Sequence, residues 1–178
     1  MTSRASGSET SVSFDLLHER VRRWIWDQQW SELRDVQETA IRTIVRGDGD
    51  VIISAATAGG KTEAAFLPIC STLLDERAVN GVQVLYAGPL KALINDQWRR
   101  LEGLCETLEI PVHRWHGDVT SAARDNLIKK PDGILLITPE SLEAMFVRRG
   151  SDVARIFGGL RYIVIDDLHA FIGRERGM

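Results

Sequence analysis

The amino-acid sequence predicts an α/β fold with a mostly parallel sheet that helices cover on both faces. Two observations lead to this prediction. Short apolar segments alternate along the chain with segments of helical periodicity. The apolar segments, such as "ILLIT" (134–138), are almost continuously hydrophobic, which is typical of parallel strands buried on both faces. Polar motifs follow these segments, at the edge of the sheet where ligands bind in such folds.

Five strands are expected, and a helix follows each of the first four. The expected strands span 51–54, 82–87, 112–116, 134–138 and 160–166. The helices after them span about 60–76, 90–108, 120–129 and a segment that begins at Pro139. Two further helices precede the first strand. One begins at Ser13, which is expected to cap it, and the other covers 35–46 before "GDGD" ends it.

The composition is that of an ordinary globular domain. The chain has 178 residues, of which 44% are hydrophobic and 26% are charged. Residues 1–12 are rich in serine and threonine, so we expect a disordered leader there and one domain over 13–178. No apolar run is long enough to cross a bilayer, and the N-terminus lacks the features of a secretory signal. We therefore expect a cytoplasmic protein with no membrane partner.

Charge and cysteine content argue against a bulk-charge nucleic-acid surface, a metal site formed by cysteines and a disulfide framework. The net charge of −3 is not that of a domain that coats nucleic acid through bulk charge, so any contact with nucleic acid must use a few oriented groups. Cys70 and Cys105 have the spacing of neither a metal site nor a disulfide framework. We expect both to be reduced thiols that pack on helices.

The stretch "SAATAGGKTEAAF" (54–66) has the order of a phosphate-binding loop, with a strand, a turn of small residues, Gly-Lys-Thr and a helix. Such a turn points backbone N–H groups inward, and the helix N-terminus adds a partial positive charge. Lys61 would contact the β- and γ-phosphates, and the hydroxyl of Thr62 would ligate Mg²⁺. Gly59 and Gly60 would let the backbone approach the phosphates. The alternative is an ordinary turn with a surface lysine.

The stretch "YIVIDDLH" (162–169) is an apolar strand that ends in two aspartates. A carboxylate at a strand end beside a phosphate loop is typical of the Mg²⁺ site of phosphate-loop enzymes. Asp166 is the candidate for the metal, through water, and Asp167 is the candidate that polarises the attacking water. The alternative is an acidic turn after a buried strand.

Five stretches follow the order seen in superfamily-two DExH-box helicases: "ATAGGKTEAAFLP", "GPLKALINDQ", "HGDV", "TPESL" and "IDDLH". The chain resembles this family over about 30–176 and looks closest to the large helicase-related group. The resemblance implies a RecA-like three-layer sandwich that binds ATP and Mg²⁺. It also implies two partners, namely a single nucleic-acid strand, with DNA favoured over RNA, and a second RecA-like domain in the same or another chain.

The resemblance also implies roles for individual residues. Gln37, in "LRDVQ", would recognise the adenine edge, the alternative being a solvated helix glutamine. His169 would couple the nucleotide site to the rest of the motor, or would be a structural histidine. Catalysis would rest on Lys61, Asp166 and Asp167, and the metal on Thr62 and Asp166. The nucleotide loop would consist of Thr57, Ala58, Gly59, Gly60, Lys61 and Thr62.

Two further segments resemble those that hold the sugar–phosphate backbone in this family. They contribute Pro89, Leu90 and Lys91 from "GPLKAL", and Thr138, Pro139 and Glu140 from "TPESL". Such contacts position a strand without reading its sequence. Trp115 could stack on a base, but we favour a packing role for it.

The chain departs from the family pattern in three ways. Asp167 stands where the family has glutamate, and the shorter side chain withdraws the carboxylate by more than an ångström, a displacement that can slow catalysis by about a hundredfold. Ala56 and Ala58 stand where the family usually has proline and glycine. The chain also ends at Met178, shortly after the acidic motif, so we expect the RecA-like domain to be incomplete at its C-terminus and the fragment alone to be inactive.

Two functions from different classes follow. The first is the ATP-binding motor domain of an ATP-dependent helicase or translocase that moves on DNA or RNA. The second is a hydrolysis-deficient module that binds nucleotide and nucleic acid as an adaptor in a larger complex. A small-molecule kinase with the same loop is disfavoured by "GPLKAL" and "TPESL", and by the lack of an arginine-rich lid.

Overall fold

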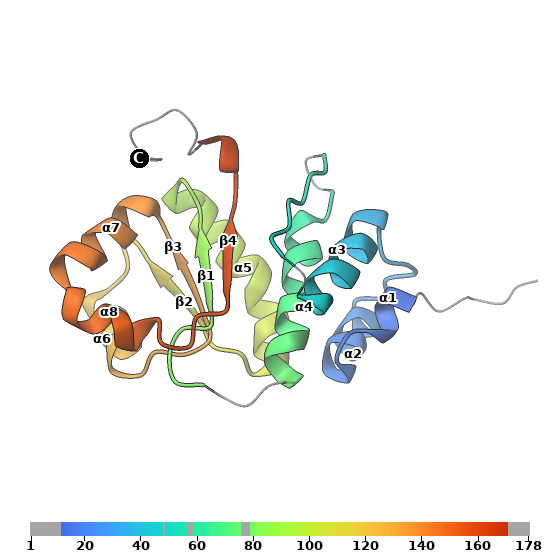
Figure 1. Ribbon diagram of the computed structural model, residues 1–178, viewed down its shortest axis with the longest axis horizontal. Helices are drawn as coiled ribbons and strands as arrows, with labels where there is room; N and C mark the ends of the chain where they lie inside the picture. The colour runs from blue at the N-terminus through green and yellow to red at the C-terminus, as the bar shows by residue number, and fades with distance from the viewer. Residues whose placement is uncertain (1–11, 48, 57–58, 76–78, 171–178) are drawn as a thin grey trace, which may run out of the picture. The chain divides into compact units, whose positions relative to one another are not determined.

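The computed structural model describes residues 12–47, 49–56, 59–75 and 79–170 (Figure 1). The chain divides into two compact units, Met1–Asp75 and Glu76–Met178. The first is helical and carries the glycine-lysine-threonine motif, and the second contains the sheet. The expected disordered leader at 1–12 lies outside the described residues, apart from Val12.

The described part of the first unit contains four helices, α1 (Val12–Asp15), α2 (Glu19–Asp27), α3 (Asp35–Arg46) and α4 (Lys61–Asp75). The expected single helix from Ser13 is wrong, because α1 ends at Asp15 and a new helix begins after His18. The Nδ1 of His18 caps this second helix by accepting a hydrogen bond of 3.1 Å from the backbone N–H of Arg20. Ser13 lies inside α1 and is buried, with its hydroxyl 3.3 Å from Glu38. The helix over 35–46 is confirmed, and Gly47 ends it with a left-handed φ of 69°.

The expected strand over 51–54 is not formed. Its residues are described but belong to no helix or strand, and Ile52 is largely exposed. An extended segment becomes a strand only when a neighbour satisfies its N–H and C=O groups. The described part of the first unit contains no other strand to do so.

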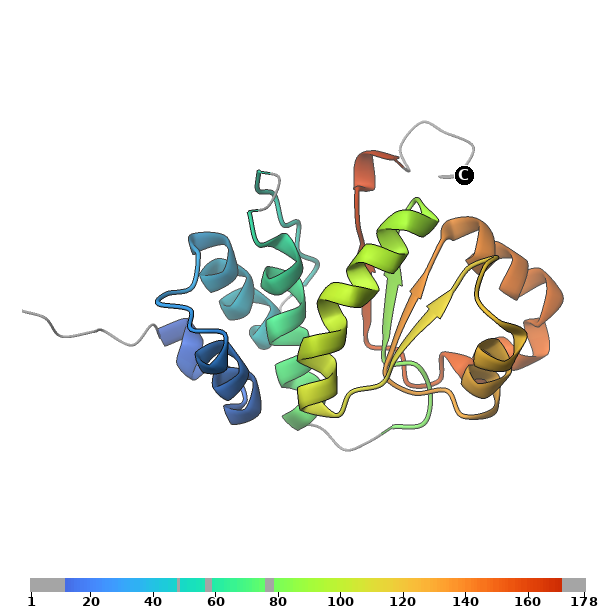
Figure 2. The same cartoon turned by 180° about the vertical axis from the view of Figure 1, so that it is seen from behind.

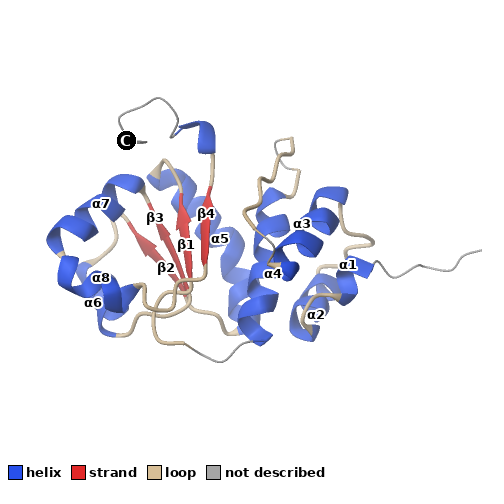
Figure 3. Cartoon of the chain, in the orientation of Figure 1, coloured by secondary structure: helices blue, strands red, loops and turns tan. Residues whose placement is uncertain are grey.

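The second unit contains a four-stranded sheet made of β1 (Val84–Ala87), β2 (Val112–Trp115), β3 (Ile134–Ile137) and β4 (Tyr162–Ile165). All neighbours are parallel, in the order β2-β3-β1-β4 (Figure 3). The parallel sheet and four of the five expected strands are therefore confirmed. β4 forms one edge of the described sheet, where Ile163 and Ile165 remain 61% and 50% exposed.

Helices cover both faces of this sheet, which gives three layers. α5 (Lys91–Leu108) packs against one face, seen in front of the strands in Figure 2. α6 (Ser121–Lys129), α7 (Pro139–Arg148) and α8 (Gly150–Ile156) enclose an apolar core on the other face. Successive residues of a strand point to opposite faces of the sheet. Leu85 and Leu135 point to the face that α6, α7 and α8 cover, and they belong to the apolar core there. A short 3₁₀ turn, η1 (Leu168–Ala170), follows β4.

Cys70 and Cys105 are buried free thiols on α4 and α5, as expected. None of the helices in the described part of the chain combines the length and the hydrophobicity that a bilayer span requires.

Candidate functional sites

The glycine-lysine-threonine motif opens α4, with Lys61 as its first residue. The ammonium of Lys61 donates hydrogen bonds of 2.8 Å and 3.2 Å to the carbonyls of Ala55 and Ala56. The turn before α4 therefore folds back toward its own lysine, and Gly59 N–H donates to the Ala56 carbonyl at 2.9 Å. Thr57 and Ala58, two of the predicted nucleotide contacts, lie outside the described residues.

Gln37 lies directly against this turn. A Cβ built on Gly60 would stand 2.7 Å from Nε2 of Gln37, and Gly60 has a φ of +82°. Gln37 is only 3% exposed, so its alternative interpretation as a solvated helix residue is wrong. Its Oε1 accepts a hydrogen bond of 3.0 Å from the backbone N–H of Arg34, which fixes the amide. The structure thus brings together two predicted nucleotide residues, Gln37 from α3 and Gly60 from the turn before α4.

Thr62 lies in the first turn of α4, beside Lys61. The N-terminus of this fifteen-residue helix carries a partial positive charge and N–H groups without helical partners. The local groups are therefore a lysine, a threonine hydroxyl, a fixed amide and a helix N-terminus. This combination suits a ligand that carries a phosphate group and a ring with hydrogen-bonding edges. The lysine and the helix N-terminus can hold the phosphate, and the amide can hold the ring.

The second unit holds the acidic motif at the end of β4. The backbone N–H of Asp166 donates to the Ala87 carbonyl at 3.0 Å, which continues the β1–β4 pairing past the strand. Its Oδ2 accepts a hydrogen bond of 2.5 Å from the Tyr86 hydroxyl, and its Oδ1 accepts one of 3.0 Å from Asp167 N–H. Both carboxylate oxygens are thereby oriented.

Tyr86 is a site residue that sequence reasoning missed. Burial, then the hydrogen bond to Asp166 and the negative charge of that carboxylate, raise the pKa of Tyr86 far above its ordinary value. The tyrosine therefore remains a hydrogen-bond donor. The pairing register of β1 and β4 could have identified it. Tyr86 pairs with Val164, two residues before Asp166, and it is the only side chain of β1 that can donate a hydrogen bond.

Asp167 and His169 follow in an exposed turn. Asp167 has a left-handed φ of 50°, and its carbonyl accepts a hydrogen bond of 2.7 Å from Ala170 N–H, which forms η1. His169 lies within η1 and is exposed. Aspartate adopts this backbone conformation more readily than most residues.

The oxygen groups present are compatible with Mg²⁺. The described residues contain no group of three or more His, Cys, Asp or Glu side chains suited to a metal. Magnesium in phosphate sites needs only one or two carboxylates, because the phosphates and water supply the other ligands. A carboxylate has about four lone-pair positions, so Asp166 keeps capacity beyond its two hydrogen bonds.

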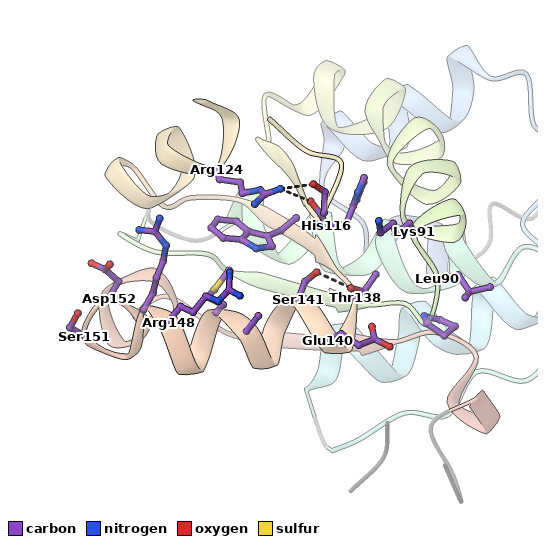
Figure 4. A pocket seen from close by; sticks show the side chains of 16 residues that line it. Leu90, Lys91, His116, Arg124, Thr138, Glu140, Ser141, Arg148, Ser151 and Asp152 are labelled. Atoms are coloured by element: carbon purple, nitrogen blue, oxygen red, sulfur yellow. Dashed lines mark hydrogen bonds between the residues drawn. The ribbon is translucent and has the colours of Figure 1, made fainter. Parts of the chain in front are cut away.

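A pocket of about 810 Å³ lies where β1, β2 and β3 end in the second unit (Figure 4). Five of the six predicted nucleic-acid contacts line it, and Pro139 does not. Those five are Pro89, Leu90, Lys91, Thr138 and Glu140. Segments far apart in the sequence therefore converge on one concave surface.

Thr138 and Lys91 stand at the same end of the pocket. Thr138 is buried, and its hydroxyl donates a hydrogen bond of 3.0 Å to Ser141 at the start of α7. Lys91 Nζ is 3.1 Å from Oδ1 of Asp118, and both side chains are more than half exposed. Exposed ion pairs contribute about 0–1 kcal/mol. Lys91 can therefore exchange Asp118 for another anion at little cost.

His116 is a second pocket residue that sequence reasoning did not assign to a site. It is 3% exposed, and its Nε2 is 3.1 Å from Oδ1 of Asn95. That oxygen also accepts a hydrogen bond of 2.8 Å from Arg114. Nε2 therefore carries the proton, and Nδ1 keeps a lone pair with no hydrogen-bond partner among the described residues. Burial lowers the pKa of His116, although Asp118 opposes this shift.

Trp115 has the packing role that we favoured. It is buried within the apolar core between the sheet and helices α6 to α8. The guanidinium of Arg124 lies over its ring, 5.8 Å from the centroid. The face of the ring is therefore not open to a base.

The sequence and the fold match proteins of one family. The family model described as DEAD/DEAH box helicase matches residues 34–178. The chain is 34% identical to the ATP-dependent helicase Lhr-Core of Methanothermobacter thermautotrophicus, over 92% of this chain and 20% of that protein. It thus spans about a fifth of the length of the Lhr-Core relatives that it matches.

Solved structures of related helicases share the fold. The Mycobacterium smegmatis helicase Lhr, bound to ssDNA and AMP-PNP, matches with a TM-score of 0.79 at 29% identity, over 93% of this chain and 22% of that one. The DUF1998 helicase MrfA, bound to DNA and AMPPNP, matches with a TM-score of 0.76 at 25% identity, over 88% and 22% of the respective chains. The RecA-like α/β architecture that the sequence predicts is thereby confirmed.

Proposed function

Because the chain belongs to the DEAD/DEAH box helicase family, we propose that it is the ATP-binding domain of an ATP-dependent helicase or translocase that moves on a nucleic-acid strand. The observation that carries this proposal is the contact between Gln37 and Gly60 beside Lys61. It puts an amide that can recognise a base next to a lysine and a helix N-terminus that can hold phosphates.

In this proposal, different residues of the first unit contact different parts of the nucleotide. Gln37 recognises adenine, and the loop of Thr57, Ala58, Gly59 and Gly60 surrounds the phosphates. Lys61 gives up its carbonyl partners for phosphate oxygens, since hydrogen bonds between charged groups are stronger than those to neutral carbonyls. Thr62 would be one ligand of Mg²⁺.

The residues of the second unit supply the remaining groups. Asp166 would hold Mg²⁺, through water, in the orientation set by Tyr86. Bound Mg²⁺ would neutralise charge on the β- and γ-phosphates. Asp167 would orient the attacking water, and His169 would couple the site to strand movement. A second RecA-like domain, from the same or another chain, would complete the motor in the cytoplasm.

The nucleic-acid partner in this proposal is a single strand of DNA, held through its phosphates. Pro89, Leu90, Lys91, Thr138 and Glu140 line the pocket at the strand ends, and Pro139 begins the helix beside them. The ssDNA in the Mycobacterium smegmatis Lhr structure favours DNA over RNA.

Calorimetric titration with Mg·ATP tests the nucleotide site. The Lys61→Ala variant is expected to lose detectable binding, because the β- and γ-phosphates lose their cation. Lys129→Ala, a change on the exposed part of α6, serves as the matched control and should bind like the wild type. Equal affinity of Lys61→Ala and the control would rule out this site.

A second candidate is a domain that binds ATP without hydrolysing it and acts as an adaptor. The left-handed φ of Asp167 favours it, because the short carboxylate stands on a backbone turned away from ordinary strand geometry. ATP turnover by the chain joined to its second domain, with and without single-stranded DNA, separates the two. Stimulated turnover supports the motor, and binding without turnover supports the adaptor.

A further inference from the structure

The pocket extends well beyond the predicted contacts, along the whole length of α7. Glu140, Ala144 and Arg148 repeat every four residues and therefore share one face of the helix. Ser141 and Met145 lie beside them in the lining. A ten-residue helix is about 15 Å long. Figure 4 shows Thr138 at one end of this face and Arg148 toward the other.

Two more arginines line the pocket besides Arg148, namely Arg124 from α6 and Arg149 from the residue after α7. Arg124 donates hydrogen bonds to the carbonyls of His116, Gly117 and Val119, which hold it rigidly in the wall. Its Nε is buried and has no hydrogen-bond partner among the described residues. Arg149 is 4.0 Å from Asp125. Arg124 thus adds a fixed positive charge to the pocket wall, whereas Asp125 offsets part of the charge of Arg149.

Arg148 differs from both. It is exposed, and within the described residues it makes no hydrogen bond or ion pair. The nearest acidic residue of the lining in sequence, Asp152, is already paired with Arg155 at 3.0 Å. Arg148 therefore brings a charge to the pocket that the described protein does not neutralise.

We propose that α7 is a track for the bound strand, in which Arg148 contacts a phosphate several positions away from the phosphate held at Lys91 and Thr138. Phosphates along one strand of B-DNA are about 3.4 Å apart along the axis, so 15 Å accommodates more than one of them. The ligand is a single-stranded polynucleotide, recognised through its backbone. This inference rests on the proposed nucleic-acid function.

A purely structural role is the competing explanation, since a cation in the last turn of a helix stabilises the helix dipole. The two roles differ in their salt dependence. The slope of log K against log salt concentration is negative, and loss of one phosphate contact to a single strand reduces its magnitude by about 0.7. Loss of a dipole interaction lowers the melting temperature without changing that slope.

The experiment measures binding of a fluorescent oligothymidylate by anisotropy over a series of salt concentrations. Arg148→Gln is compared with Arg148→Lys and with Arg99→Gln, which removes an exposed arginine of α5 that does not line the pocket. We expect Arg148→Gln to weaken binding and to reduce the magnitude of the slope by about 0.7. Arg148→Lys should keep the wild-type slope, and Arg99→Gln should change neither quantity.

Oligonucleotide length supplies the second readout. The loss caused by Arg148→Gln should disappear with an oligonucleotide too short to reach from Thr138 to Arg148. An equal loss with short and long oligonucleotides would overturn the track. If Arg148→Gln kept the wild-type slope while Lys91→Gln made it shallower, the track along α7 would be wrong, but the proposed nucleic-acid function would stand. Absence of binding by the wild type would overturn the proposed nucleic-acid function as well.

Discussion

The hydroxyl of Tyr86 lies 2.5 Å from Oδ2 of Asp166 and donates a hydrogen bond to it. The tyrosine comes from β1 and is buried, whereas the aspartate follows β4, the neighbouring strand. A side chain inside the sheet thus orients the first carboxylate of the acidic motif. This arrangement makes the chemistry of Asp166 depend on a residue outside that motif.

Tyr86→Phe is expected to lower the free energy of unfolding by about 1–2 kcal/mol, because Asp166 loses a donor. The pKa of Tyr86 is raised in the folded state, so its contribution is complete below about pH 10, the value in the unfolded chain, and is lost as the pH rises above it. Tyrosinate absorbance during alkaline titration measures this. The wild type should show a tyrosine that ionises only on unfolding, and the variant should not. A wild type in which both tyrosines ionise before unfolding would contradict the hydrogen bond.

His116 should make stability sensitive to mild acid. Its pKa is lowered in the folded state by burial, opposed by Asp118 and assisted by Arg114, Lys91 and Arg124. Folding then excludes a proton that the unfolded chain binds below about pH 6.5. Its contribution is complete above that pH and is lost as the pH falls below it. Urea unfolding of the wild type and of His116→Asn at about pH 7.5 and about pH 5.5 measures this. The free energy of unfolding should fall less between the two pH values in the variant than in the wild type.

Gly60→Ala should destabilise the first unit and displace Gln37. The new Cβ would stand 2.7 Å from Gln37 Nε2, at a φ of +82° that alanine rarely adopts. We expect a loss of about 1–3 kcal/mol in urea unfolding and a weaker affinity for ATP. The matched control is Gly103→Ala in α5, where nothing lies within 4 Å of the added atom. That change should stabilise the protein by about 0.5–1 kcal/mol.

Asp167→Glu tests whether the shorter carboxylate limits hydrolysis. The longer side chain should raise ATP turnover of the complete motor by on the order of tenfold to a hundredfold. It should also lower stability by about 1 kcal/mol, because glutamate adopts the left-handed backbone of residue 167 less readily than aspartate. Asp167→Asn keeps that backbone preference without the charge and should not raise turnover. A decrease with Asp167→Glu would show that the missing methylene is not the limit.

The elements that could be predicted are those whose pattern is local. Apolar spacing and Gly47 set α3 at 35–46, and β1, β2 and β3 fall inside predicted strands. The residues at 51–54 have the same apolar character, yet they form no strand. Strand formation depends on a hydrogen-bonding neighbour, which the composition of the segment does not reveal.

The candidate sites show the same division. Motif order predicted that Lys91 and Thr138 contact one nucleic-acid strand, and both line one pocket because parallel strands end at the same edge of the sheet. Tyr86 and His116 were missed, since their roles depend on strand register and on burial at a strand end. Arg148, on which the proposed track rests, lies outside the predicted motifs, because only the first turn of α7 carried one.

The open edge of β4 affects how the protein behaves in a test tube. Ile163 and Ile165 present an apolar stripe beside backbone groups that the described sheet leaves available. Such an edge is a template on which strands of other molecules can assemble. Concentrated solutions of the chain should therefore turn cloudy on warming, and a lysine introduced at the outer position, as in Ile163→Lys, should keep them clear.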